Sequence, residues 1–164
     1  MKLSNLLSTS QCDNLLDKFK KFSNQVYHTT EPTYRFKPSA LGHFMLCEMS
    51  LNECVGIWRE VEKNMPWPSE LKSAKILYYK RGCFFPSHVD ASHGEQGDDH
   101  SIVIQLNRTE DFKGGVPYIE HQTLELEQGD AVVHNYHIKH GVTKVESGRR
   151  IVLNLRVKRL QNLK

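Results

Sequence analysis

The segment that decides the fold of this chain covers residues 79–90 and reads YKRGCFFPSHVD. At its end, a single residue separates His88 from Asp90. Side chains at positions i and i+2 of an extended strand point to the same side. The pattern therefore predicts that this imidazole and this carboxylate can hold one metal ion together, with a third ligand from another part of the chain.

The later part of the chain offers candidates for the third ligand: His121, His134, His137 and His140. His140 precedes a run toward the last strand, which can place it across a sheet from the first pair. For His134 and His137, a polar position at the rim of the fold is favoured. The rival triplet 93–95 (His-Gly-Glu) stands in a predicted loop, where the positions of side chains are poorly fixed. Two histidines and one carboxylate are the ligands of non-haem Fe(II) oxygenases.

Composition indicates a globular chain of one domain. The 164 residues include 38% hydrophobic and 25% charged residues, and no apolar run is long enough for a membrane span. We therefore expect one domain over residues 1–164, with helical support in 1–70 and a catalytic core in 71–160. The location expected by default is cytoplasmic, because residues 1–10 form a poor signal peptide.

Charge and cysteines add little to the functional interpretation. The net charge of +3 does not by itself indicate a nucleic-acid partner, although basic residues near the C-terminus permit one. The four cysteines show no zinc-binding spacing, and we expect reduced thiols.

Helical patterns occupy the first part of the chain. Residues 8–23 carry apolar side chains at helical spacing after Ser8 and Gln11, which form a capping-box signal. Residues 50–63 repeat this arrangement behind Ser50 and Glu53. Between them, an edge strand or loop is expected at 26–34 and a short strand at 42–49.

The remainder of the chain is predicted to be a set of short strands. Alternation or β-forming residues occur at 76–79, 101–106, 117–120, 123–126, 130–133 and 149–157, with glycines between them. Such a series indicates a sandwich, barrel or jelly roll. The predicted fold class is therefore mainly β with flanking helices.

The last strand has two distinct faces. Arg150, Val152, Asn154 and Arg156 share one face, and Ile151, Leu153 and Leu155 share the other. The apolar face is expected to pack under the N-terminal helices. The opposite face is solvated or lines a cavity, where Arg150 could bind a carboxylate through two parallel hydrogen bonds. Arg149 is the alternative anchor, but alternation places it with the apolar set.

Taken in order, these motifs make residues 71–157 similar to the Fe(II)- and 2-oxoglutarate-dependent dioxygenases, in particular the prolyl 4-hydroxylase-like branch. The resemblance begins with Tyr79 and the His88/Asp90 pair. It continues through segment 101–107 with the Phe-Lys-Gly-Gly of 112–115, the turn and strand at 129–133, and the distal block 140–150. Three positions depart from the family pattern: Pro117, His134 and Lys144.

The resemblance implies a double-stranded β-helix, or jelly roll, with N-terminal helices packed on the larger sheet. It implies that His88, Asp90 and His140 are the catalytic metal ligands for Fe(II). It also implies that Arg150 and Tyr79 hold the distal carboxylate of 2-oxoglutarate. Ascorbate is a further candidate cofactor, and the loop 91–100 is a candidate lid over the substrate.

The activity implied is hydroxylation of a C–H bond with O2, releasing succinate and CO2. Prolyl residues of a peptide or protein are the first candidate substrate. The alternatives are a small molecule, a nucleic-acid base, or a non-catalytic cupin-like metal-binding module.

Overall fold

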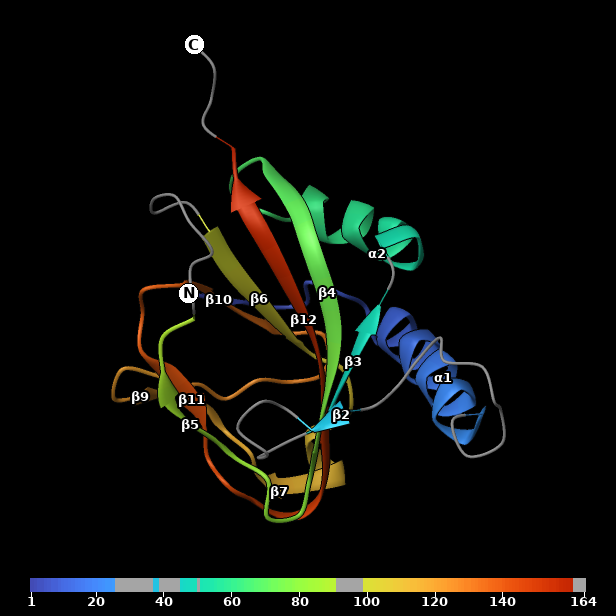
Figure 1. Ribbon diagram of the computed structural model, residues 1–164, viewed down its shortest axis with the longest axis vertical. Helices are drawn as coiled ribbons and strands as arrows, with labels where there is room; N and C mark the ends of the chain where they lie inside the picture. The colour runs from blue at the N-terminus through green and yellow to red at the C-terminus, as the bar shows by residue number, and fades with distance from the viewer. Residues whose placement is uncertain (26–36, 39–44, 50, 91–98, 161–164) are drawn as a thin grey trace.

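Two antiparallel sheets face each other and enclose the centre of the protein (Figure 1). The computed structural model describes residues 1–25, 37–38, 45–49, 51–90 and 99–160. The larger sheet has the order β1 (Lys2–Leu3), β10 (Ala131–Asn135), β6 (Asp99–Gln105), β12 (Val145–Arg159), β4 (Ser69–Lys80), β3 (Met45–Met49) and β2 (Lys37–Pro38), with β7 (Phe112–Gly114) also paired to β12. The smaller sheet has the order β5 (Phe85–His88), β11 (His140–Val142), β8 (Pro117–Ile119) and β9 (Gln122–Thr123).

Strand β12 is the centre of the larger sheet and pairs with β4 on one side and β6 on the other. Its alternating side chains divide as the sequence predicts. Leu153 and Leu155 are fully buried in the core that includes the helices, whereas Val152 belongs to a second core between the two sheets. The polar residues that alternate with the leucines therefore face the space between the sheets.

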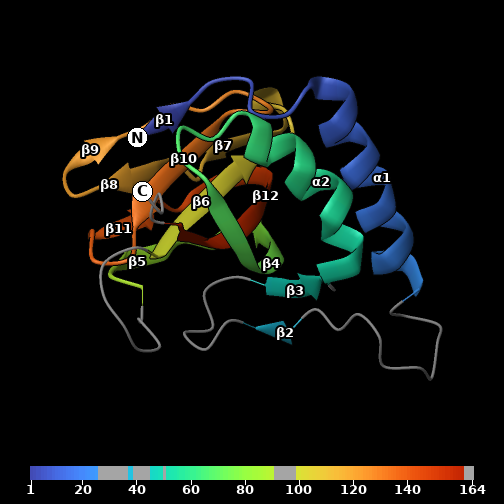
Figure 2. The same cartoon turned by 90° about the horizontal axis from the view of Figure 1, so that it is seen from above.

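Both helices cover the outer face of the larger sheet, away from the smaller one (Figure 2). Helix α1 spans Thr9–Gln25 and helix α2 spans Leu51–Lys63. The capping box predicted for the first helix is present, because the Ser8 amide donates to Gln11 Oε1 at 2.8 Å and the Gln11 amide donates to Ser8 Oγ at 3.3 Å. Leu15, Phe19 and Val61 are among the buried residues of this outer core.

The predicted fold class is confirmed: a mainly β jelly-roll core with helices on its larger sheet. Some strand boundaries differ from the prediction. Strand β4 begins at Ser69, well before residue 76, because its polar first half pairs with the end of β12. Residues 124–126 are not a strand, and Leu126 is buried outside the sheets.

Several predictions fall where the structure gives no description. The expected edge strand or loop at 26–34 lies outside the described residues, as do Ser50 of the second capping box and residues 91–98 of the candidate lid. The short strand expected at 42–49 is described only over Met45–Met49. In the described part of the chain, no helix is long and apolar enough to cross a membrane.

Candidate active site

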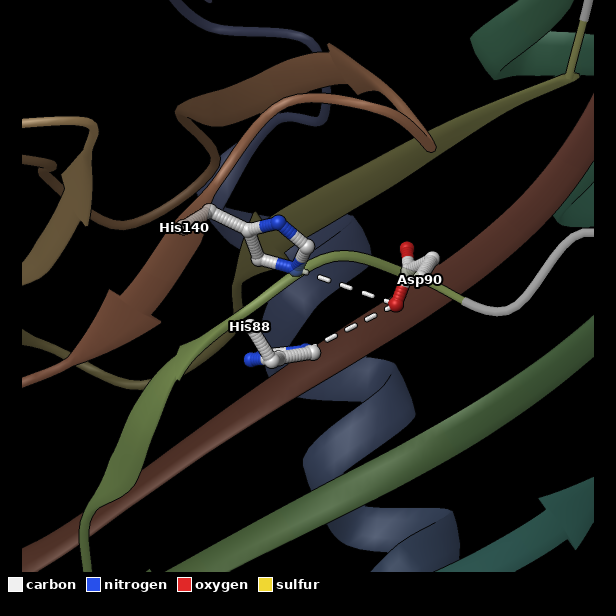
Figure 3. Close-up of side chains that lie close together, drawn as sticks. All are labelled: His88, Asp90 and His140. Carbon is white, nitrogen blue, oxygen red and sulfur yellow. Dashed lines mark ion pairs between the residues drawn. The ribbon is translucent and has the colours of Figure 1, made fainter.

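The smaller sheet brings His88 and His140 together. His88 ends β5 and His140 begins β11, and the two residues are Cα partners in the antiparallel register. Asp90 lies just beyond β5, where its amide donates to the Tyr136 carbonyl at 3.0 Å. Ligand atoms from the three residues all lie within 4.8 Å of one another, and their side chains converge (Figure 3).

Backbone carbonyls fix the orientation of both imidazoles. His88 Nδ1 lies 2.9 Å from the Pro86 carbonyl oxygen, and His140 Nδ1 lies 2.8 Å from that of Ile138. A carbonyl oxygen can only accept, so each Nδ1 carries the proton and each Nε2 presents a lone pair. These Nε2 atoms lie 3.6 Å and 3.8 Å from Asp90 Oδ1. This tautomer is the one that binds metal through Nε2.

His88 Nε2 is buried and has no hydrogen-bond partner within the described residues. A buried polar atom without a partner costs free energy, on the order of 1–3 kcal/mol. A metal ion at this position would satisfy it. The donor set of two imidazoles and one carboxylate also suits Fe(II), so the residues fit the metal that the sequence predicts.

The protonation states suit metal binding as well. Burial raises the pKa of Asp90, but contacts with His88, Ser101, His140 and Arg156 together hold it well below its usual range. Ser101 Oγ donates to Asp90 Oδ2 at 2.7 Å, which leaves Oδ1 toward the histidines. Burial also lowers the pKa of His140. The site therefore holds an ionised carboxylate beside an imidazole that favours its neutral form.

Arg150 lies in the same space between the sheets and is only 1% exposed. Its Nε donates to Gln105 Oε1 at 3.0 Å, while both terminal nitrogens are buried without a hydrogen-bond partner in the described residues. The guanidinium carbon lies 5.5 Å from the centre of the Tyr79 ring, on the neighbouring strand. Burial raises the pKa of Tyr79 to about 12, so this residue is a neutral phenol.

One pocket contains both features. The residues that line it include Asp90 and His140 of the cluster, as well as Tyr79 and Arg150. Asn154 also lines this pocket. The pocket measures about 500 Å³ including its open side. Gly115 permits the arrangement, because a Cβ there would lie 3.1 Å from Arg150 Cδ and 2.9 Å from the Val145 side chain.

His134 was predicted at the rim, and this prediction is wrong. It is 4% exposed and lines the pocket, with its ring centre 3.8 Å from that of His140. Burial lowers its pKa to about 4, so the ring is neutral at physiological pH. Alternation along β10 carries the missed signal, since His134 shares a face with Val132, which also lines the pocket.

The structure separates the other candidates from the cluster. His121 and His137 are exposed, and Arg149 is exposed on the strand beside buried Arg150. Arg156 approaches the cluster from another side, with Nη2 3.7 Å from Asp90 Oδ1. The rival triplet 93–95 lies outside the described residues.

A jelly roll with two imidazoles, a carboxylate and a buried arginine between its sheets is typical of non-haem iron oxygenases that use a keto-acid cosubstrate. Residues 74–157 match the sequence model of the 2OG-Fe(II) oxygenase superfamily, and the chain belongs to this superfamily. The protein is therefore an Fe(II)- and 2-oxoglutarate-dependent oxygenase. No curated protein sequence matches the chain.

Solved structures share the fold at low sequence identity. The viral collagen prolyl hydroxylase of Paramecium Bursaria Chlorella virus-1, in complex with 2OG, has a TM-score of 0.63 and 13% identity over 98% of this chain and 96% of its own. A prolyl hydroxylase from Trichoplax adhaerens, bound to a hypoxia inducible factor peptide, has a TM-score of 0.65 and 12% identity over 97% and 83%.

A third solved structure with a similar fold is an epimerase, not a hydroxylase. The non-heme alpha ketoglutarate dependent epimerase SnoN from nogalamycin biosynthesis has a TM-score of 0.67 and 11% identity, over 97% of this chain and 76% of its own. The three structures agree in fold, but two are prolyl hydroxylases and the third is an epimerase. The shared fold alone therefore does not single out one substrate.

Proposed function

We propose that the chain hydroxylates a C–H bond at an iron held by His88, Asp90 and His140. The observation that carries the proposal is that one pocket is lined by Asp90 and His140 of this cluster and by Arg150, whose two terminal nitrogens are unpaired within the described residues. Three protein ligands leave positions open for a chelating cosubstrate and for O2. A buried guanidinium in the same pocket suits the far end of a dicarboxylate.

In this proposal, Arg150 binds the distal carboxylate of 2-oxoglutarate through the two nitrogens that lack partners. Gln105 holds Nε of Arg150 and thereby fixes the plane of the guanidinium. The guanidinium carbon lies over the Tyr79 ring, which is itself buried. The cosubstrate would therefore bind to a site that is already oriented, which reduces the entropy lost on binding.

When bound, the iron and 2-oxoglutarate supply the oxidation, in which O2 contributes one oxygen atom to the substrate and one to succinate, with release of CO2. The protein's own residues orient and protect this chemistry. The carbonyls of Pro86 and Ile138 keep both histidines from turning. Ser101 holds the second oxygen of Asp90, so that the carboxylate presents the first.

We propose prolyl residues of a peptide or protein as the first candidate substrate. Support comes from the fold shared with prolyl hydroxylases, one of which is bound to a peptide. A small molecule is the alternative, supported by the equally similar fold of the epimerase. Ascorbate is included as a candidate reductant that keeps the iron in its Fe(II) state.

The test measures 2-oxoglutarate consumption and succinate release with Fe(II), O2 and ascorbate, with and without proline-containing substrates. Mass spectrometry then detects addition of one oxygen atom to the substrate. The His88→Ala variant should lose all turnover, whereas the exposed His121→Ala control should retain it. Full turnover in His88→Ala would show that the ligand assignment is wrong.

A further inference from the structure

Arg156 is a second cation beside the metal cluster, and the proposed cosubstrate site does not use it. It lies on the same face of β12 as Arg150. Unlike Arg150, it is not among the residues that line the pocket with Asp90 and His140. Its Nη2 lies 3.7 Å from Asp90 Oδ1, and its guanidinium carbon lies 5.2 Å from the centre of the Tyr136 ring. The side chain is 30% exposed, so a ligand can reach it.

The carboxylate of Asp90 is a poor permanent partner for Arg156. Their contact is longer than a hydrogen bond, and within the described residues the guanidinium donates no hydrogen bond. Asp90 faces both histidine Nε2 atoms, and a metal dication held there would repel a neighbouring guanidinium. Asp99, the other acidic residue near Tyr136, makes no ion pair with Arg156 in the described ranges.

The guanidinium carbon of Arg156 lies over the Tyr136 ring. Tyr136 is buried. Its backbone carbonyl accepts a hydrogen bond from the Asp90 amide, and its own amide donates to the Asp99 carbonyl. A planar guanidinium with unpaired donors is suited to binding a carboxylate with two parallel hydrogen bonds. Arg150 and Arg156 thus offer two carboxylate sites, one for the cosubstrate and one at the exposed side of the cluster.

We infer that Arg156 binds a carboxylate of the substrate, so that the substrate presents a free carboxylate close to the oxidised carbon. For a prolyl substrate, this carboxylate belongs either to free L-proline or to a C-terminal prolyl residue of a peptide. The inference rests on the proposed function, because it takes the metal and cosubstrate positions from it.

The test uses protein loaded with Zn(II), which cannot oxidise, and saturated with 2-oxoglutarate. Calorimetry measures binding of the twenty common L-amino acids and of acetyl-Gly-Pro, each beside its neutral carboxamide. At least one acid should bind about ten- to a hundredfold more tightly than its amide, as expected for a charge-assisted hydrogen bond. Comparison of L-proline with acetyl-Gly-Pro separates the two sources of the carboxylate.

Three variants test whether Arg156 causes the preference for acid over amide. Arg156→Gln should remove the preference for acid over amide, Arg156→Lys should keep part of it, and the exposed Arg149→Gln on the same strand should keep all of it. 2-Oxoglutarate binding should be unchanged in all three. Loss of that binding in Arg156→Gln would instead show that Arg156 only supports Asp90, and would overturn the inference.

Two other outcomes also decide the question. Equal binding of acids and amides to a protein that binds 2-oxoglutarate normally would overturn this inference and leave the proposed function intact. A wild-type protein that fails to bind 2-oxoglutarate with metal would overturn both. A peptide with an internal proline and blocked ends provides the last comparison, since it should bind no more tightly than the amides.

Discussion

Individual residues of the site are held by the backbone before any metal arrives. Each histidine donates its Nδ1 proton to a carbonyl two residues earlier in its own chain segment. The free energy of ordering these rings is therefore spent during folding and not during binding. Arg150 shows the same design, with one nitrogen fixed by Gln105 and two left for a ligand.

Replacement of Arg150 tests this design at the residue scale. Arg150→Lys keeps the positive charge but loses the planar pair of donors. We expect the dissociation constant for 2-oxoglutarate to rise about ten- to a hundredfold, measured by calorimetry on the metal-loaded protein. Arg149→Lys is the matched control and should bind normally. If the two variants behave alike, Arg150 is not the cosubstrate anchor.

The sequence predicted which residues meet, but it did not predict all that surrounds them. One intervening residue placed His88 and Asp90 together, and alternation placed Arg150 in the interior. His134 was missed because a histidine is more common at a rim than packed against a second histidine in a pocket. The contact between Arg156 and Asp90 could not be predicted, because it depends on how the two sheets face each other.

At the scale of elements, β12 links the helical core to the site. Its leucines pack under the helices while the residues between them line the interior. Because a strand is stiff, the outer core fixes the positions of Arg150 and Asn154. The short strands β1 and β7 escaped prediction, since two or three residues carry too little periodicity to be recognised.

A core substitution on this strand should reduce stability without altering the site directly. Leu153→Ala removes a fully buried side chain from the helix-facing core and should lower the free energy of unfolding by about 2–5 kcal/mol. Urea denaturation measures the change. The control Leu160→Ala, at a 42% exposed position, should cost less than about 0.5 kcal/mol. Similar losses in both variants would contradict the assigned core.

Helix α1 carries a thiol that should make stability depend on pH. Burial, and then the charge of Asp13, raise the pKa of Cys12 from 9.0 to about 11. The unfolded thiol loses its proton first, so stability is complete below about pH 9 and falls as pH rises toward 11. The loss attributable to this group is about 3 kcal/mol.

Urea unfolding at pH 8 and pH 11 measures this loss, and Cys12→Ala should show a smaller decrease than the wild type. The comparison between the two proteins removes the contribution of tyrosines, which also titrate at high pH. Cys12 should also resist thiol reagents at neutral pH in the folded protein, because it is fully buried. Rapid labelling without unfolding would contradict its burial.

For the whole molecule, the two-layer arrangement was predicted from strand number, turn residues and the family resemblance. Helices on one face of the larger sheet leave its other face for the smaller sheet and the site (Figure 2). Chain order alone could not predict the pairing of β5 with β11, which joins residues far apart in the sequence. That pairing brings His88 and His140 together at the proposed metal site.

The central claim is that this cluster and Arg150 bind Fe(II) and 2-oxoglutarate together. Anaerobic visible absorption of the metal-free protein, titrated with Fe(II) and then with 2-oxoglutarate, tests it most directly. The account predicts a weak charge-transfer band that requires both, disappears in His88→Ala and remains in His121→Ala. A folded protein that shows no such band, or a band that persists in His88→Ala, would contradict the account.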